Sequence, residues 1–298
     1  MSSWTPAEMP DQSDRTFVVT GANSGIGLAA ARELAASGAH VVLAVRDAAK
    51  GEAAAAGLSG EPEVRALDLA DLASVRAFAE GLDRNIDVLV NNAGVMATPH
   101  RTTADGFELQ LGTNHLGHFA LTGLLLPRIQ DRVVTIASGA HRIGKINFGD
   151  LQSERSYRRW LAYGQSKLAN LLFMYEFQRR LDAAGSPLRS VAAHPGYAAT
   201  SLQSHTESIQ DRIMAVSNRI FAQSDEQGAW PTLYAATTPD LPGGSYVGPG
   251  GFLEQRGNPK LVGSSAAARD EDTARRLWDV SEELTGVQYE FGVTADTA

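Results

Sequence analysis

Short runs of apolar residues alternate along the chain with longer stretches in which apolar positions recur every three or four residues. The short runs are rich in valine, isoleucine and leucine and end near Gly, Asp or Asn, as buried strands do. The longer stretches are typical of helices with one buried face. The pattern predicts strands at residues 16–20, 41–45, 63–67, 88–90, 132–137, 189–193 and 245–247, and helices at 25–37, 48–58, 71–81, 105–126, 157–184, 225–237 and 271–284.

This alternation predicts an α/β fold: one Rossmann-type, doubly wound parallel sheet with helices on both faces. Right-handed crossovers bring the carboxyl ends of all the strands to one edge, where ligands bind in such sheets. No linker marks a second domain, so residues 1–298 are expected to form a single domain. Three parts lie outside the alternation: a loose N-terminal lead at 1–14, a substrate lid segment at 201–224, and a C-terminal extension at 248–298.

The expected lid is mostly polar but carries Ile209, Ile213 and Met214, which suits an amphipathic segment. With the loop after Ser138 it would wall a mostly apolar substrate site, because a lid must exclude water from the reaction. The strand at 245–247 is expected at the edge of the sheet, since only a glycine-rich tail and one acidic helix follow it.

Composition narrows the function classes. The 298 residues are 43% hydrophobic and 20% charged, which is typical of a soluble globular protein. The formal net charge of −8 argues against a surface for nucleic acid or anionic membrane. The chain has no cysteine, so disulfides, thiolate metal sites and thiol nucleophiles are excluded. The first residues lack the apolar core of a signal peptide, so a cytoplasmic location is expected.

One uncharged stretch, residues 109–127, approaches the length of a membrane span. It contains Asn114, His115 and His118 and lies in the middle of the domain, so no membrane span is expected. The two histidines are three residues apart and could hold a metal, but no carboxylate lies between them and no metal site is expected. Three arginines near residue 157 could meet an anionic substrate, although a solvated basic turn explains them as well.

A glycine-rich turn connects the first strand to the first helix. It reads Thr-Gly-Ala-Asn-Ser-Gly-Ile-Gly over residues 20–27. Glycines there let a pyrophosphate approach the backbone N–H groups at the positive end of a helix dipole. A second strand follows at the distance that a βαβ unit requires. The sequence therefore predicts a dinucleotide cradle here, formed by Gly21, Asn23, Ser24, Gly25, Ile26 and Gly27.

Tyr163 and Lys167 are four residues apart in a predicted helix, so their side chains lie on one face within reach of each other. A phenol has a pKa of about 10, and an adjacent ammonium stabilises the phenolate anion. The pair can therefore give or take a proton. On its own such a pair is usually a solvated helix face. Here Ser138, at the end of a predicted strand, and Asn114, in the preceding helix, fall at the same edge of the sheet.

Together these motifs resemble the short-chain dehydrogenase/reductase family over about residues 15–200. The glycine turn, the Asn-Asn-Ala-Gly run at 91–94, Tyr-x-x-x-Lys at 163–167 and Pro195-Gly196 with Thr200 match the family in order. Residues 114–119 and 161–170 are similar to the branch of retinol-dehydrogenase-like and protochlorophyllide-reductase-like enzymes. Ser138 precedes Tyr163 by 25 residues, about twice the usual separation, and that branch carries such an insertion.

The resemblance implies a role for each matching residue. Tyr163 would be the acid/base, Ser138 would bind the substrate oxygen, Lys167 would lower the pKa of the tyrosine and hold the nicotinamide ribose, and Asn114 would orient a water. Tyr163 would also contact the cofactor. The remaining cofactor contacts would be Asp68 and Leu69 at the adenine, Asn91 near the adenosine ribose with Ala93 and Gly94, and Pro195, Gly196 and Thr200 near the carboxamide.

The end of the second strand favours NADP(H) over NAD(H). NAD-specific members place a carboxylate there, and the matching position holds Val45. The next residue, Arg46, has a planar guanidinium that can pair with a 2′-phosphate. Asp47 falls too late in the register for an NAD determinant and is expected to face solvent or cap the next helix. NAD(H) is kept as the second option.

The resemblance thus implies an NADP(H)-dependent oxidoreductase that interconverts an alcohol and a ketone or aldehyde. A reductase of a conjugated carbon–carbon double bond is the alternative within the branch. A nucleotide-sensing protein without turnover is disfavoured, because such relatives usually lack the Tyr/Lys pair. The expected partner is a small, largely apolar carbonyl or alcohol, and the sequence is compatible with a homo-oligomer, either a dimer or a tetramer.

Overall fold

One mixed sheet forms the centre of the computed structural model, which describes residues 4–196 and 224–291. Within those residues the eight strands follow the order β3-β2-β1-β4-β5-β6-β7-β8. All neighbours are parallel except the last pair, β7 and β8. The strands are β1 (Thr16–Thr20), β2 (His40–Val45), β3 (Glu63–Ala66), β4 (Ile86–Asn91), β5 (Ile129–Ile136), β6 (Arg189–Ala193), β7 (Tyr246–Pro249) and β8 (Pro259–Leu261).

The chain winds outward from β1 in both directions. It first builds β2 and β3 on one side, then returns to place β4 on the other, so that Val18 pairs with both Val42 and Leu89. In a doubly wound sheet the crevice at this reversal, beyond the carboxyl ends of the strands, is the ligand site. The expected Rossmann-type fold is confirmed.

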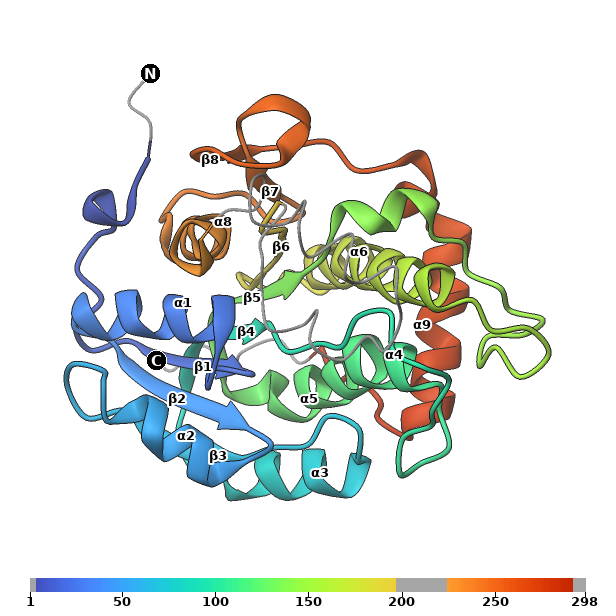
Figure 1. Cartoon of the computed structure of the whole chain (residues 1–298), viewed down its shortest axis with the longest axis horizontal. Coiled ribbons are helices and arrows are strands. Elements are labelled where there is room, and N and C mark those ends of the chain that lie inside the picture. Colours follow the sequence, from blue (N-terminus) through green and yellow to red (C-terminus); the bar gives the residue numbers. More distant parts are fainter. Residues whose placement is uncertain (1–3, 197–223, 292–298) are drawn as a thin grey trace.

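Helices cover both faces of the sheet, and the strand residues alternate between the two cores. Phe17 and Val19 face α1 (Gly25–Ala36), α2 (Ala48–Ala55) and α8 (Asp225–Thr237). Val18, between them, faces the opposite core, which is built from the other helices. These are α3 (Leu72–Gly81), α5 (Gly117–Leu125), α6 (Arg159–Ala183) and α9 (Glu271–Thr285). Figure 1 shows α1 beside α8 on one face and α3 and α5 on the other.

Aspartate side chains cap the starts of several helices. The carboxylate of Asp71 accepts the backbone N–H of Ala73, at 2.9 Å, at the start of α3. Asp47 accepts from the backbone N–H of Lys50, at 3.1 Å, and caps α2, as the sequence predicted. Such caps satisfy N–H groups that have no partner within the helix.

The helix expected at 105–126 is not continuous. A single turn, α4 (Leu109–Leu111), leads into a π-helical turn, η2 (Gly112–Leu116), and then into α5. The carboxylate of Glu108 accepts the N–H groups of the next turn and so fixes the start of α4. In η2 the N–H of Gly117 reaches back five residues to the carbonyl of Gly112. Hydrophobic spacing alone cannot reveal the extra residue of such a turn.

The C-terminal part contributes to the sheet and its cover. β7 was expected at the edge, and this is wrong: β8 pairs with it antiparallel, with Val247 opposite Leu261. Three residues beginning with a proline are too short to read as a strand, and β8 forms because the preceding loop returns the chain to β7. Four further short helices lie in the connections. η3 (Leu126–Arg128) precedes β5, η4 (Gly139–Ile143) follows β5, η6 (Phe252–Glu254) lies between β7 and β8, and η7 (Ala266–Arg269) precedes α9.

The N-terminal lead is attached to the domain from residue 4 onward, unlike the loose lead that was expected. It contains a short helix, η1 (Pro6–Glu8), and the ring of Trp4 contacts that of Tyr234 edge-on at 5.4 Å. The expected lid at 201–224 falls outside the described residues, except for Ser224, the N-cap of α8. Across the described ranges, no helix is both long and apolar enough to cross a bilayer.

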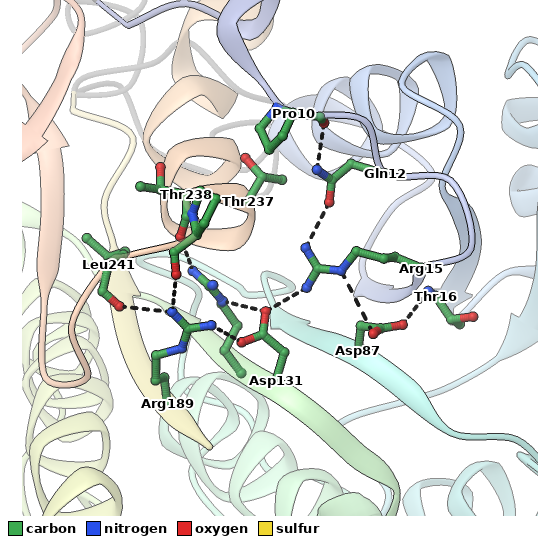
Figure 2. Close-up of polar contacts among 12 residues, drawn as sticks. Pro10, Gln12, Arg15, Thr16, Asp87, Asp131, Arg189, Thr237, Thr238 and Leu241 are labelled. Atoms are coloured by element: carbon green, nitrogen blue, oxygen red, sulfur yellow. Dashed lines mark hydrogen bonds and ion pairs between the residues drawn. The ribbon is translucent and has the colours of Figure 1, made fainter. Parts of the chain in front are cut away.

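A cluster of arginines around Asp131 ties the amino ends of four strands to α8 (Figure 2). The carboxylate of Asp131 accepts from Arg15 at 2.6 Å and from Arg132 at 3.0 Å, and also from Arg189. Arg132 is 1% exposed and donates to the carbonyls of Ala235 and Thr238 at the end of α8. This cluster holds the edge of the sheet opposite the carboxyl ends of the strands.

Candidate active site

A large cleft of about 1190 Å³ lies at the carboxyl edge of the described sheet. That volume exceeds the usual range for one drug-sized ligand, so a dinucleotide and a substrate can share it. The loops after β1, β2, β3, β4, β5 and β6 all contribute to its wall. Of the residues singled out from the sequence, it is lined by Gly21, Asn23, Ser24, Gly25, Ile26, Gly27, Arg46, Asp68, Leu69, Ala93, Gly94, Ser138, Tyr163, Lys167, Pro195 and Gly196.

The glycine turn has the geometry of an anion cradle. Gly21 and Gly25 have φ angles of +68° and +57°, which side chains rarely allow. At Gly27 a Cβ atom would lie 2.6 Å from the carbonyl oxygen of Gly21, so only glycine permits this close approach. The turn leads directly into the N-terminus of α1, whose first residues line the cleft. These features fit the pyrophosphate of a nicotinamide dinucleotide.

The two asparagines at the end of β4 point in different directions. Asn92 lines the cleft and donates from Nδ2 to the carbonyl of Thr20 at 2.7 Å, which fastens the glycine turn to β4. Asn91 is 1% exposed, donates to Thr122 at 2.9 Å and does not line the cleft. The side chain expected near the ribose is thus turned into the core, because successive strand residues alternate between faces.

The end of β2 and the first turn of α2 each bring a basic side chain to the cleft. Arg46 is exposed there and lines the wall together with Asp47 and Lys50. The ammonium of Lys50 lies 3.3 Å from the carboxylate of Asp47 and is 72% exposed. Sequence reasoning had not included Lys50, although its position one turn into α2 follows from the cap at Asp47.

Tyr163 and Ser138 lie next to each other in the wall of the cleft. Tyr163 lies on α6 and is 6% exposed, whereas Ser138 ends β5 and caps η4 by accepting from the N–H of Ala140 at 3.2 Å. Burial raises the pKa of Tyr163 to about 12, and its hydrogen bond with the Ser138 side chain opposes that rise. The phenol is therefore protonated at neutral pH and can donate a proton.

Lys167 follows one turn later on α6. Its ammonium donates to the carbonyl of Ile136 at 3.0 Å, and burial lowers its pKa to about 8. Asn170 donates to the same carbonyl at 3.0 Å. The sequence suggested that Lys167 lowers the pKa of Tyr163. In the structure burial dominates, and the net pKa of the phenol is raised.

Asn114 lies in the π-helical turn and is completely buried. Its side chain accepts from the N–H of Val95 at 2.8 Å and donates to the carbonyl of Val95 at 2.9 Å. A further bond from Nδ2 reaches Ser166 on α6 at 2.9 Å. Asn114 does not line the cleft, and its side chain joins the loop after β4 to the helix that carries Tyr163. Thr200, also expected at the site, lies outside the described residues.

The two histidines of this region are occupied by protein partners. Nε2 of His118 lies 2.9 Å from the hydroxyl of Thr20, and Nε2 of His115 lies 2.9 Å from that of Ser281. Burial lowers the pKa of His115 to about 3 and that of His118 to about 4. Both are therefore neutral hydrogen-bonding groups in the core, each with Nε2 engaged by a protein hydroxyl.

Several cleft residues were missed by sequence reasoning. His194 directly precedes Pro195, and Arg142 lies on η4. Trp160 lies in the first turn of α6, with its ring centre 6.2 Å from that of Tyr163. Their positions next to recognised motifs could have drawn attention to them. Leu253 and Glu254 reach the cleft from the β7–β8 loop, and no local signal indicates this.

Comparison with known proteins gives a consistent family assignment. The family model for short chain dehydrogenases matches residues 15–211. Retinol dehydrogenase 12 from Homo sapiens is 43% identical over 293 residues, covering 93% of this chain and 88% of its own. Polyprenol dehydrogenase from Mus musculus is 40% identical over 297 residues, with 94% and 87% covered.

Solved structures agree with this assignment. An uncharacterized protein from Mycobacterium Paratuberculosis is 54% identical, with a TM-score of 0.85 over 97% of this chain and 100% of its own. A protein from Beutenbergia cavernae, named as an NAD(P)-dependent gluconate 5-dehydrogenase with NADP bound at low occupancy, is 30% identical. Its TM-score is 0.58, with 76% of this chain and 92% of its own covered. The chain therefore belongs to the short-chain dehydrogenase family, in its retinol-dehydrogenase-like branch, and is an oxidoreductase that interconverts alcohols and carbonyls with a nicotinamide cofactor.

Proposed function

We propose that this enzyme uses NADP(H) to interconvert an apolar alcohol and its aldehyde or ketone. Tyr163, Ser138 and Lys167 would act at the substrate, and Asn114 would hold the helix that carries Tyr163 in place. The observation that carries the proposal is the shared cleft. A buried Tyr/Lys pair, a serine hydroxyl and a glycine-rich anion cradle line the same cavity. This is the combination that proton transfer next to a bound dinucleotide requires.

The chain's own residues have separable tasks. A nicotinamide dinucleotide, when bound, supplies or accepts the hydride. Tyr163 donates a proton to the carbonyl oxygen during reduction and takes it back during oxidation. The hydroxyl of Ser138 donates a hydrogen bond to the same oxygen and so orients the substrate. Lys167 compensates the negative charge that develops on Tyr163, because its ammonium is buried on the same helix face.

The preference for NADP(H) rests on Arg46. Its exposed guanidinium lines the cleft at the end of β2, and the neighbouring carboxylate of Asp47 is engaged by the backbone N–H and the ammonium of Lys50. A guanidinium binds a phosphate with two charge-assisted hydrogen bonds, which a ribose hydroxyl does not offer. Lys50 adds a second positive charge to the same wall.

The substrate is proposed to be largely apolar. Trp160, which lines the cleft beside Tyr163, offers an aromatic surface. The names of two relatives, a retinol and a polyprenol dehydrogenase, refer to alcohols with long hydrocarbon chains. A substrate of that class would bury apolar surface on binding and leave only its oxygen to be positioned by polar groups.

Cofactor oxidation and product analysis test this function together. Purified enzyme is incubated with NADPH or NADH and a panel of aliphatic aldehydes, ketones and one α,β-unsaturated ketone. We expect NADPH oxidation with aldehydes and the corresponding alcohol as the product. Reduction of the carbon–carbon double bond of the unsaturated ketone would instead support the alternative within this branch. Cofactor binding without turnover of any of these compounds would contradict the proposed function.

A further inference from the structure

The loop between β7 and β8 extends from the sheet edge into the mouth of the cleft. The strands continue to pair at its base, where the N–H of Gly250 donates to the carbonyl of Asn258 at 2.7 Å. Leu253, Glu254 and the following glutamine line the cleft, whereas the neighbouring Phe252 does not. Part of this C-terminal loop therefore belongs to the active site, about 90 residues after Tyr163 in sequence.

The tip of the loop has a costly backbone conformation. Leu253 and Glu254 have φ angles of +51° and +56°, in the left-handed region that side chains disfavour. Two consecutive non-glycine residues in that region persist only where surrounding contacts hold them, and such positions are common at ligand clamps. The contacts that hold this tip indicate what it does.

Glu254 makes those contacts. Its carboxylate lies 3.8 Å from the guanidinium of Arg142 and 3.3 Å from Nε2 of His194. Arg142 belongs to η4, the short helix that Ser138 caps, and it also donates to the carbonyl of Gly263 at 3.0 Å. One carboxylate thus connects the loop tip to two other segments that line the cleft.

His194 is suited to this contact. Its Nδ1 accepts the backbone N–H of Gly196 at 3.2 Å, so in the neutral ring the proton resides on Nε2. The ring is 2% exposed, and Nε2 has no hydrogen-bond partner among the described residues. A buried donor without a partner is unfavourable, and the carboxylate of Glu254 is the acceptor within reach.

Leu253 has the opposite character. It is 71% exposed although it lines the cleft, so its apolar surface is free to be covered by a bound molecule. Phe252 is 84% exposed but lies outside the cleft. The two neighbours therefore differ in whether a substrate can reach them.

We propose that the β7–β8 loop is a selective wall of the substrate site, in which Leu253 is a specificity-determining residue for the apolar part of the substrate and Glu254 is the positioning residue that holds it there. This inference rests on the proposed function. It adds a preference for substrates with a long hydrocarbon chain. Leu253 sets this preference, and the contacts of Glu254 with Arg142 and His194 hold Leu253 in place.

The first test compares Leu253→Ala with Phe252→Ala as a matched control. Initial rates are measured with NADPH and propanal, hexanal or decanal. In Leu253→Ala we expect kcat/KM for decanal to fall by at least ~5-fold and that for propanal to stay within ~2-fold, since lost apolar contact affects only the substrate long enough to make it. Phe252→Ala should match the wild type with all three. Equal losses with propanal and decanal, or the same loss in Phe252→Ala, would overturn the proposal.

The second test removes the anchor. Glu254→Gln keeps the side-chain size but loses the charge, and Glu254→Asp keeps the charge. We expect Glu254→Gln to show the same selective loss for decanal through a higher KM, with faster hydrogen exchange of the amides at 250–256. In Glu254→Asp the KM for decanal should lie between those of the wild type and Glu254→Gln. A uniform drop in kcat for every aldehyde, or wild-type exchange in the loop, would refute the positioning role.

A binding experiment keeps this inference separate from the proposed reaction. Calorimetry measures the affinity of decanol for wild type and Leu253→Ala in the presence of NADP⁺, with no turnover of an aldehyde. Weaker binding in Leu253→Ala supports the wall even if the enzyme reduces none of the aldehydes tested. Equal affinity in both proteins contradicts the wall even if reduction is observed.

Discussion

The ammonium of Lys167 lies 5.8 Å from the centre of the Tyr163 ring, one turn further along the same face of α6. Burial disfavours the charged form of each group: the pKa of the phenol is raised to about 12 and that of the ammonium is lowered to about 8. When Tyr163 gives up its proton, the two opposite charges compensate each other in a site shielded from water. The pair is therefore arranged to stabilise a transient phenolate more than a resting one.

Replacing Tyr163 with phenylalanine tests the proton donor. We expect Tyr163→Phe to keep the fold and the affinity for NADPH, because only one hydroxyl is removed. The turnover number should fall at least ~100-fold, since general acid/base catalysis typically contributes about 10²–10⁴-fold. Steady-state rates with hexanal and fluorescence titration with NADPH provide the measurements. A folded variant with near-normal turnover would remove Tyr163 from the mechanism.

Arg46 tests the cofactor preference. We expect the wild type to favour NADPH over NADH by at least ~10-fold in kcat/KM, which corresponds to about 1.4 kcal/mol, a modest value for a charge-assisted contact. Arg46→Ala should lose most of this preference, because kcat/KM falls for NADPH and stays nearly unchanged for NADH. Lys50→Ala serves as the comparison and should cause a smaller loss. If the preference survives in Arg46→Ala, another group reads the phosphate.

The close contact between Gly144 and Gly164 tests how Ser138 is held beside Tyr163. A Cβ atom at Gly144 would lie 2.2 Å from the carbonyl oxygen of Gly164 on α6. Gly144→Ala should therefore push the segment after Ser138 away from α6, lowering both kcat and the melting temperature. Gly263→Ala is the control, because nothing lies within 4 Å of its Cβ position. The explanation fails if the two variants behave alike in rate assays and thermal melts.

Buried histidines predict a loss of stability in mild acid. The pKa values of His115, His118 and His194 are lowered to about 3, 4 and 4, respectively. In an unfolded chain the pKa of histidine is about 6.5. Between these pH values the unfolded state binds more protons than the folded state. The free energy of unfolding therefore has its full value above about pH 6.5 and declines as the pH falls toward about 4. One such histidine costs about 2 kcal/mol at pH 5.

The measurement is the difference in unfolding free energy between pH 7 and pH 5. His115→Gln should reduce this difference, because glutamine can still bond Ser281 but does not titrate. His100→Gln, at an exposed position, should leave the difference as it is in the wild type. An unchanged difference in His115→Gln would show that acid acts elsewhere.

Asp131 tests the arginine cluster of Figure 2. Asp131→Asn leaves three guanidinium groups around a neutral side chain. We expect the free energy of unfolding to fall by about 3 kcal/mol, since removal of one partner leaves buried charge unpaired. Asp279→Asn is the control, because its ion pair with Arg180 is exposed and worth less than about 1 kcal/mol. Urea unfolding of both variants gives the comparison. If their free energies of unfolding are equal, the cluster does not stabilise the fold.

Local patterns predicted most of the fold and the centre of the site. The glycine turn and the Tyr/Lys pair depend on spacings within one segment, so the sequence displays them directly. Asn91 and Asn92 were harder, because a one-residue alternation in the strand decides which of them faces the cleft. Leu253 and Glu254 could not be predicted, since they reach the site through the pairing of β8 with β7, a contact that no local pattern encodes.

The two ends of the described sheet have a consequence for how the protein behaves at high concentration. An edge strand with free N–H and carbonyl groups invites pairing with another chain, and such pairing seeds aggregates. β3 carries Glu63 and Arg65 along one edge, and β8 has only three residues, among them Pro259 and Lys260. Charge on one side and a short, proline-containing strand on the other discourage the sheet from growing between molecules. A fold built on a long apolar sheet can in this way stay dispersed in a crowded solution.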